Sequence, residues 1–303
     1  MPVSSSRYEL LRKPLVRFTR TFKGVGKGQE KALHRARVAS RRLREILPVL
    51  QLDSKVTEDL ARRLRKVTSR IGPARELDVM QLQLEELQQS GRFDSSSLSR
   101  VAAAVAKRRS AARERLLAKL PVTALRRVAA KLARIADQLA KDEDVPVRSQ
   151  AATRGWRWAI GARIARRATS LKAAIDDAGS VYLPERLHAV RIAVKKFRYA
   201  VELEHEISGD EKLTPQLRIL ARHQELLGRL HDRQLLIEQV RQVQAASTPP
   251  DLGAWQRLDA VSRTLEYECR RLHARYLRDS TALVAVCDRL PRRSPVAAAR
   301  RAG

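Results

Sequence analysis

The apolar positions of this chain recur with a helical period along nearly its whole length. In the segment that starts near residue 33, Ala36, Ala39, Leu43 and Ile46 follow one another at intervals of three or four residues. They form a stripe of the width that a bundle core needs, with charged side chains on the opposite side. Alanine, leucine and valine fill most apolar positions, and glycine and proline are sparse, which favours helices over strands. The pattern therefore predicts an all-α fold.

Short polar segments interrupt this period and mark the ends of the predicted helices. They lie at 24–28, 53–54, 90–97, 121–123, 142–146, 179–184, 208–215, 245–253 and 279–281. Several contain the serine, threonine, glycine or proline that is typical of helix ends. The breaks predict about four helices in each half of the chain, with a short final helix in the second half. The basic, proline-containing segment 291–303 is predicted to be disordered.

A basic segment of the first half recurs in the second half. The residues from His34 to Arg44 are matched by those from His188 to Arg198, 154 positions later. Three further pairs of segments follow in the same order: 71–76 with 227–232, 108–113 with 270–275 and, more weakly, 123–125 with 281–283. Chance similarity could explain any one pair of alanine- and arginine-rich helices. Four ordered pairs favour an internal duplication.

The duplication divides the chain into two similar halves. Four helices with short connections suit an antiparallel bundle, so we expect one four-helix bundle in each half. The boundary is predicted within 142–149. We assign residues 1–147 to the first bundle, 148–290 to the second and 291–303 to the basic tail.

Each copy of the repeated segment places cations in a row along one side of its helix. At about 100° per residue, the members of each row lie within roughly 80° of the leading histidine. The apolar stripe occupies the other side of the same helix. The rows are His34, Arg37, Arg41 and Arg44 in the first copy and His188, Arg191, Lys195 and Arg198 in the second.

These residue types, at this spacing, are suited to phosphate groups. The planar fork of arginine contacts two phosphate oxygens at once, and lysine supplies a compact charge. Nearby phosphate raises the pKa of a histidine and so gives it a second donor. Intervals of three and four residues place successive donors about 5–6 Å apart. A single basic stripe is often only a solvated face, but its repetition, histidine included, favours a binding site. A nucleic-acid backbone would also fit.

Further cations recur at matching positions. Arg75 next to Glu76 corresponds to His231 next to Asp232, where ion pairing and ligand contact are both open. A third basic element occurs in each half, and its candidate ligand residues are Arg109 and Arg113 in the first half and Arg271 and Arg275 in the second.

The overall charge is strongly positive. The chain has 62 lysines and arginines against 33 acidic residues, a net charge of +29. Such an excess repels itself and is usually tolerated when a polyanion neutralises it. Nucleic acid, an anionic membrane and polyphosphate all qualify, so composition alone does not choose among them.

The cysteine content and the lack of long apolar runs indicate the cellular compartment. Two cysteines give no disulfide framework and no metal-binding spacing. The first residues lack the apolar core of a signal peptide, and no run of 18 apolar residues occurs. We therefore expect a cytoplasmic protein that neither spans nor binds a membrane and needs no cofactor. No feature identifies a protein partner.

At these motifs the sequence resembles the CHAD family, the conserved histidine α-helical domain. The resemblance rests on the two histidine-led basic segments and on Leu227-Gly228-x-x-His231-Asp232, with Ile71-Gly72-x-x-Arg75-Glu76-x-Asp78 as a looser counterpart. It extends over about 8–290. The first half departs from the pattern, because Arg75-Glu76 stands where the second half has histidine and aspartate.

The resemblance implies two four-helix bundles related by a pseudo-twofold axis, with a basic pocket or channel between them. It also implies binding of inorganic polyphosphate and association with polyphosphate granules. Carried over by motif, the ligand residues are the two rows, with Arg42 and Lys196 next to them. Many members carry an additional triphosphate-tunnel domain with a Glu-x-Glu-x-Lys strand. The nearest string here, Glu202 to Glu206, lacks the lysine, so we expect a stand-alone member.

Three functions are compatible with these features. The first is non-catalytic binding of polyphosphate. The second is sequence-independent binding of DNA or RNA, for which the few aromatic residues offer poor stacking platforms; weak binding of this kind is expected in any case. The third is an enzyme of phosphoanhydride chemistry, but the chain has no Gly-x-x-x-x-Gly-Lys loop and no convincing carboxylate set for magnesium. We expect no enzymatic activity.

Overall fold

The structure, a computed structural model, describes residues 6–143, 146–246 and 251–292, with the side chains of 143, 146–154 and 292 left out. These residues form α-helices and two short 3-10 helices, and they contain no strand. The prediction of an all-α fold is confirmed. The helices of the first half are α1 (Arg7–Thr19), α2 (Phe22–Gly26), α3 (Glu30–Ile46), α4 (Ser54–Gln89), α5 (Ser95–Lys119) and α6 (Val122–Glu143). Those of the second half are α7 (Pro146–Ala178), α8 (Pro184–Ser208), α9 (Thr214–Ala245) and α10 (Leu252–Arg292).

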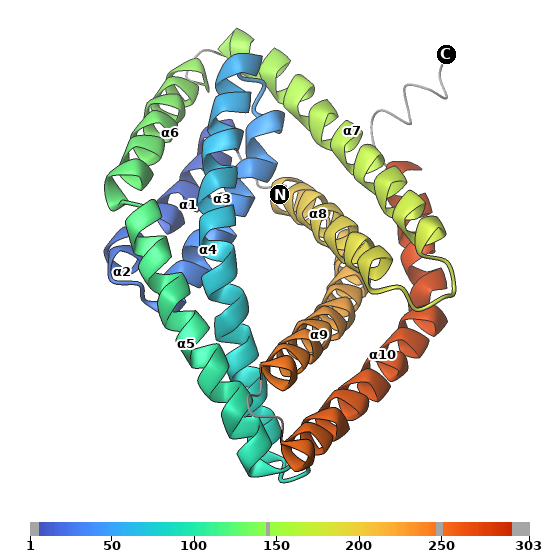
Figure 1. Cartoon of the computed structure of the whole chain (residues 1–303). Coiled ribbons are helices and arrows are strands. Elements are labelled where there is room, and N and C mark those ends of the chain that lie inside the picture. The colour runs from blue at the N-terminus through green and yellow to red at the C-terminus, as the bar shows by residue number, and fades with distance from the viewer. Residues whose placement is uncertain (1–5, 144–145, 247–250, 293–303) are drawn as a thin grey trace.

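The four central helices are α3 and α4 from the first half and α8 and α9 from the second (Figure 1). Helices α5 and α6 lie outside the first pair, and α7 and α10 lie outside the second. Two apolar cores each combine side chains from both halves. The smaller core joins α4 and α5 to α9 and α10 through residues such as Leu84, Val101, Leu236 and Leu258. The two halves therefore share buried apolar surface, which fixes α3 and α4 relative to α8 and α9.

The halves differ in the number of their helices. The first half has six α-helices instead of four, because α1 is followed by the single turn α2 and because Pro121 separates α5 from α6. The predicted break at 279–281 was wrong, since α10 continues through it. There the Ser280 hydroxyl donates to the carbonyl of Leu277 at 2.8 Å, and His223 Nε2 donates to that of Asp279 at 3.0 Å. The polar triplet is thus accommodated inside a helix.

The predicted boundaries lie close to helix ends. Helix α6 ends at Glu143 and α7 begins at Pro146, so a division between 147 and 148 would fall in the first turn of α7. Helix α10 includes Pro291 and Arg292, and the rest of the predicted tail lies outside the described residues. No described helix is both long enough and apolar enough to cross a membrane. Both cysteines, Cys269 and Cys287, are buried thiols.

Candidate functional site

A pocket of about 650 Å³ lies between the two halves. Helices α3 and α4 form one wall and α8 and α9 form the other. Half of the sixteen residues proposed as ligands from the sequence line it: His34, Arg37, Arg41, Arg75, His188, Arg191, Lys195 and His231. The pocket thus brings together cations that are more than 150 positions apart in the chain.

The first three members of each predicted row lie in the pocket. Arg37 and Arg41 of α3 face Arg191 and Lys195 of α8 closely enough to perturb their ionisation across the gap. Gly72 of α4 makes room for this arrangement, because a Cβ there would lie 2.8 Å from Arg37 Nη1. The glycine therefore lets a guanidinium lie against the α4 backbone, whereas a Cβ at the matching Gly228 of α9 would meet nothing within 4 Å.

Helices α4 and α9 complete the pocket with one cation each at the matching positions. Arg75 donates to Glu30 at 2.8 Å, so it lines the pocket and forms an ion pair as well. His231 lies against His188, with 3.2 Å between their Nδ1 atoms and 4.3 Å between ring centroids. Of the two alternatives considered for these positions, ion pairing is therefore present at Arg75, while ligand contact stays a prediction at both.

Burial and mutual repulsion lower the pKa of the pocket cations. Burial is the largest cause of the shift at Lys195, and repulsion from Arg41, Arg191 and Arg37 adds to it, so that the pKa of Lys195 falls to about 7. Burial, with repulsion from neighbouring basic side chains, lowers the pKa of His231 to about 4 and that of Arg37 to about 10. The pKa values of His34 and His188 are also lowered, first by burial. The pocket is thus an electrostatically unfavourable place for positive charge, and a bound anion would relieve the repulsion.

Three carboxylates that were not predicted as site residues also line the pocket. They are Glu76, Glu225 and Asp232, against six lysines and arginines, one of which is Arg229. Burial raises the pKa of Asp232, although Arg191 opposes this shift. The pocket keeps an excess of positive charge even with its histidines neutral, so it is suited to an anion with several charges.

Several uncharged lining residues were also missed. Gln83, Tyr199, Gln224 and Gly228 lie in the pocket. Three of them could have been found from helical spacing, since Gln224 and Gly228 are seven and three residues before His231 and Gln83 is eight after Arg75. Tyr199 follows Arg198 in the repeated segment but carried no signal of its own.

The last member of each row lies outside the pocket. Arg198 donates to Glu202 at 2.8 Å, one turn further along α8. Arg44 lies near Arg65 and Glu45, and burial is the main cause of its lowered pKa. The regular spacing continues to these residues, but the pocket ends before them, about 15 Å from the leading histidine along each helix.

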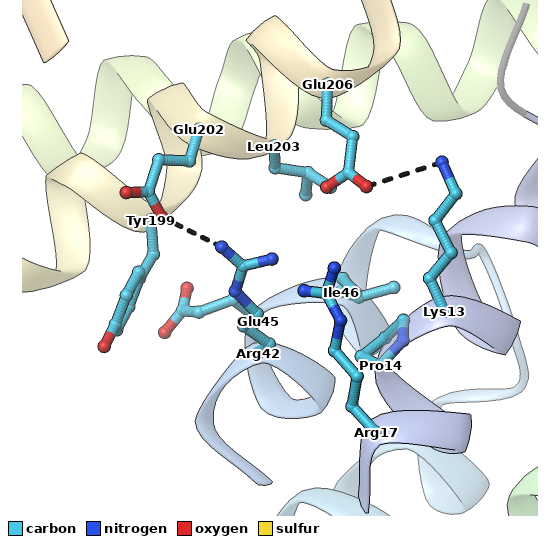
Figure 2. Close-up of a pocket in the computed structure, with 10 residues that line it drawn as sticks. All are labelled: Lys13, Pro14, Arg17, Arg42, Glu45, Ile46, Tyr199, Glu202, Leu203 and Glu206. Carbon is cyan, nitrogen blue, oxygen red and sulfur yellow. Dashed lines mark ion pairs between the residues drawn. The ribbon is translucent and has the colours of Figure 1, made fainter. Parts of the chain in front are cut away.

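Arg42 and Lys196, the two residues predicted beside the rows, do not line the pocket. Figure 2 shows Arg42 reaching toward Glu202 while Lys13 reaches toward Glu206, with ion-pair distances of 3.8 and 3.7 Å. The cavity that they line, about 30 Å³, has room for little more than a water molecule. Lys196 lines a different hollow together with Arg167, between α7 and α8.

The third basic element lies away from the pocket in both halves. Arg109 and Arg113 donate to the same oxygen of Asp78, at 2.6 and 2.9 Å, and the Asp78 side chain has no exposed surface. Arg271 and Arg275 are exposed on α10, where Arg271 lies over the ring of Tyr267. Neither pair lines the pocket, so their predicted contact with ligand stays a prediction without support from this geometry.

Comparison with known proteins agrees with this architecture. The family model of the CHAD domain matches residues 9–241. The chain is similar to the crystal structure of the CHAD domain from the plant Ricinus communis, with 20% identity, a TM-score of 0.59, and coverage of 95% of this chain and 94% of that one. It is also similar to PptA from Streptomyces chartreusis, with 18% identity, a TM-score of 0.60, and coverage of 93% and 100%. None of the curated proteins compared with it matches. The family match spans most of the chain and includes both histidine-led helices, and the protein therefore belongs to the CHAD domain family.

Proposed function

We propose that the protein binds inorganic polyphosphate in the pocket between its halves and catalyses no reaction on it. The observation that carries this proposal is the meeting of two equivalent cation rows, one from each half, across a single pocket. The residues proposed to contact phosphate are His34, Arg37, Arg41 and Arg75 from the first half and His188, Arg191, Lys195 and His231 from the second.

The electrostatics of the pocket support a polyanion as its ligand. Cations that are partly withdrawn from water and close to one another gain more from an anion than exposed cations do, because the interaction is less screened. Arginine can contact phosphate oxygens in pairs, and Arg37, Arg41 and Arg191 supply such forks from both walls. A chain of phosphates would satisfy donors along both rows, whereas a single phosphate would reach only a few.

The pocket favours polyphosphate over nucleic acid as a specific ligand. Tyr199 is the one phenylalanine, tyrosine or tryptophan among its lining residues, so it offers little surface on which bases could stack. Sequence-independent binding of DNA or RNA is the alternative, and it would depend on the general positive charge of +29 and not on the pocket.

A competition experiment separates these two functions. Labelled long-chain polyphosphate is bound at fixed salt and challenged with duplex DNA, with RNA or with unlabelled polyphosphate at equal phosphate concentration. We expect polyphosphate to compete far better. Equal competition by nucleic acid would reject specific polyphosphate binding.

Substitution of the pocket residues tests the location. Arg37→Ala, Arg191→Ala and Lys195→Ala in one variant should weaken binding strongly and reduce the slope of log affinity against log salt by about two, since about 0.7 ions are released per phosphate contact. The matched control replaces Arg218, Arg278 and Arg289, three exposed arginines that line neither this pocket nor Arg42's cavity. Circular dichroism checks that both variants stay helical. Equal losses in the two variants would place binding outside the pocket.

The absence of catalysis and the cellular site are tested separately. Incubation of the protein with polyphosphate and magnesium should release no phosphate above a protein-free blank; release that the pocket variant lacks would instead indicate an enzyme. We propose that the protein resides in the cytoplasm on polyphosphate granules. A fluorescent fusion should then colocalise with stained granules, and the pocket variant should be diffuse.

A further inference from the structure

A second basic hollow, here called the outer groove, lies along α1, α2 and α3. It has a volume of about 1010 Å³. Its cations come from the end of α1, from α2 and the turn after it, and from α3. They are Arg17, Arg20, Lys23, Lys27, Lys31, Arg35 and Arg42, with His34 at one side. Among the described residues that line the groove there is no aspartate or glutamate.

Two glycines shape the turn that brings these cations together. Gly28 has a φ of +63°, a left-handed conformation that favours glycine. Gly24 packs so closely against α3 that a Cβ there would lie 2.5 Å from the Cβ of Ala32. The Gln29 N–H donates to the Gly24 carbonyl at 2.9 Å and closes the turn. Helix α2 is thereby held against the start of α3.

Most of the groove cations have no acidic partner. Among the residues that the structure describes, no carboxylate oxygen within 4 Å forms an ion pair with Lys23, Lys27 or Lys31; the same holds for Arg17, Arg20 and Arg35. Arg42 is the exception, with Glu202 at 3.8 Å. Closely spaced cations without counter-charges repel one another, and an anion with several charges would relieve that repulsion.

The second half has a smaller hollow at the corresponding place. It lies between α7 and α8, has a volume of about 300 Å³ and contains two cations, Arg167 and Lys196. Arg167 already pairs with Glu45 at 3.5 Å. The unpaired positive charge is therefore a property of the first half and does not follow from the repeated segment alone.

The outer groove adjoins the pocket between the halves. His34 and Val38 of α3 line both. We propose that the outer groove is a second binding site for phosphate groups of the same chain, so that a long polyphosphate leaves the pocket past His34 and continues along α2 and α1. This inference rests on the proposed function, because it assumes that polyphosphate occupies the pocket.

A test measures the binding of two chain lengths to the unaltered protein and to a groove variant. The groove variant carries Lys23→Ala, Lys27→Ala and Lys31→Ala, three exposed residues. Polyphosphate of about ten and of about one hundred phosphates is titrated at several salt concentrations. For the long chain we expect a loss of about tenfold or more and a salt slope smaller by about two. The short chain is expected to occupy the pocket alone, so it should bind to the groove variant within about twofold of its affinity for the unaltered protein.

Controls separate the groove from general charge and from the pocket. Replacement of Arg218, Arg278 and Arg289 by alanine removes the same charge elsewhere, and Lys23→Arg, Lys27→Arg and Lys31→Arg together should restore long-chain binding. The groove proposal is overturned if the alanine variant matches the charge control with the long chain, or if it weakens both chain lengths equally. If the alanine variant matches the charge control, short-chain binding that is lost only in the pocket variant still upholds the proposed function. Failure of the unaltered protein to bind either chain would reject both.

Discussion

The two halves contribute matching side chains to the pocket but hold their outer cations differently. In the first half, Arg109 and Arg113 converge on the buried carboxylate of Asp78. At the position that the repeat equates with Asp78, the second half has Gln234, which accepts a hydrogen bond from Tyr182 at 3.2 Å. The corresponding arginines of α10 are exposed. A cation's place in the repeat therefore does not by itself make it a ligand residue, since a neighbouring carboxylate can hold it elsewhere.

The same comparison within the pocket shows a chemical difference. Lys195 of α8 takes the position that Arg41 takes in α3. A lysine loses its charge more readily than an arginine when it is withdrawn from water, and the pKa of Lys195 falls to about 7. The α8 wall of the pocket therefore gains or loses charge near neutral pH.

The largest expected effect concerns stability. Asp78→Ala leaves the partly buried Arg113 without its carboxylate partner and Arg109 with Glu30 alone, at 3.2 Å, and we expect the free energy of unfolding to fall by about 3 kcal/mol. Gln234→Ala should cost about 1 kcal/mol, the loss of one hydrogen bond. Urea denaturation followed by circular dichroism measures both. Equal costs would remove the proposed difference between the halves.

A smaller effect, on affinity, tests whether the two walls of the pocket are equivalent. Arg37→Ala and Arg191→Ala should each weaken polyphosphate binding by about tenfold, because each removes a charge-assisted contact of about 1.5 kcal/mol. Isothermal titration calorimetry gives the two affinities. A loss confined to one variant would show that the ligand uses one row only.

The pH dependence of binding sharpens the contrast between Lys195 and Arg41. Phosphate favours the charged form of Lys195, so above pH 7 binding takes up a proton and affinity falls as the pH rises. We expect a loss of about fivefold between pH 6 and pH 8, which Lys195→Arg should largely abolish. Calorimetry in buffers of different ionisation enthalpy measures the proton uptake. An unchanged profile in Lys195→Arg would assign the titration to other groups.

The smallest effect is expected at the exposed arginines of α10. Arg271→Ala combined with Arg275→Ala should weaken polyphosphate binding by less than about threefold, through loss of general positive charge. Fluorescence anisotropy with labelled polyphosphate is sensitive enough to detect this. A loss as large as that of Arg37→Ala would return these residues to the binding site and contradict the placement of the pocket.

Sequence reasoning predicted the local features of this fold and missed those set by distant contacts. Helical period is a local property, so the helices and the two cation rows followed from it. The row could not reveal where the pocket ends, because that depends on α3 and α8 approaching each other and on Glu202 pairing with Arg198. Of the residues of α9 that line the pocket, only His231 was predicted. The outer groove was missed because α2 is a single turn whose glycines resembled a simple break.

The burial of both cysteines has a practical consequence. Neither Cys269 nor Cys287 is exposed, and burial raises the pKa of both thiols, that of Cys287 to about 12. Thiolates are the form that reacts with alkylating dyes, so the folded protein should be nearly inert to such reagents. A cysteine introduced at an exposed position of the pocket such as Glu225, which is not a proposed ligand residue, would then take up the dye selectively. Its emission would report, at one chosen point, when a phosphate chain arrives and when it departs.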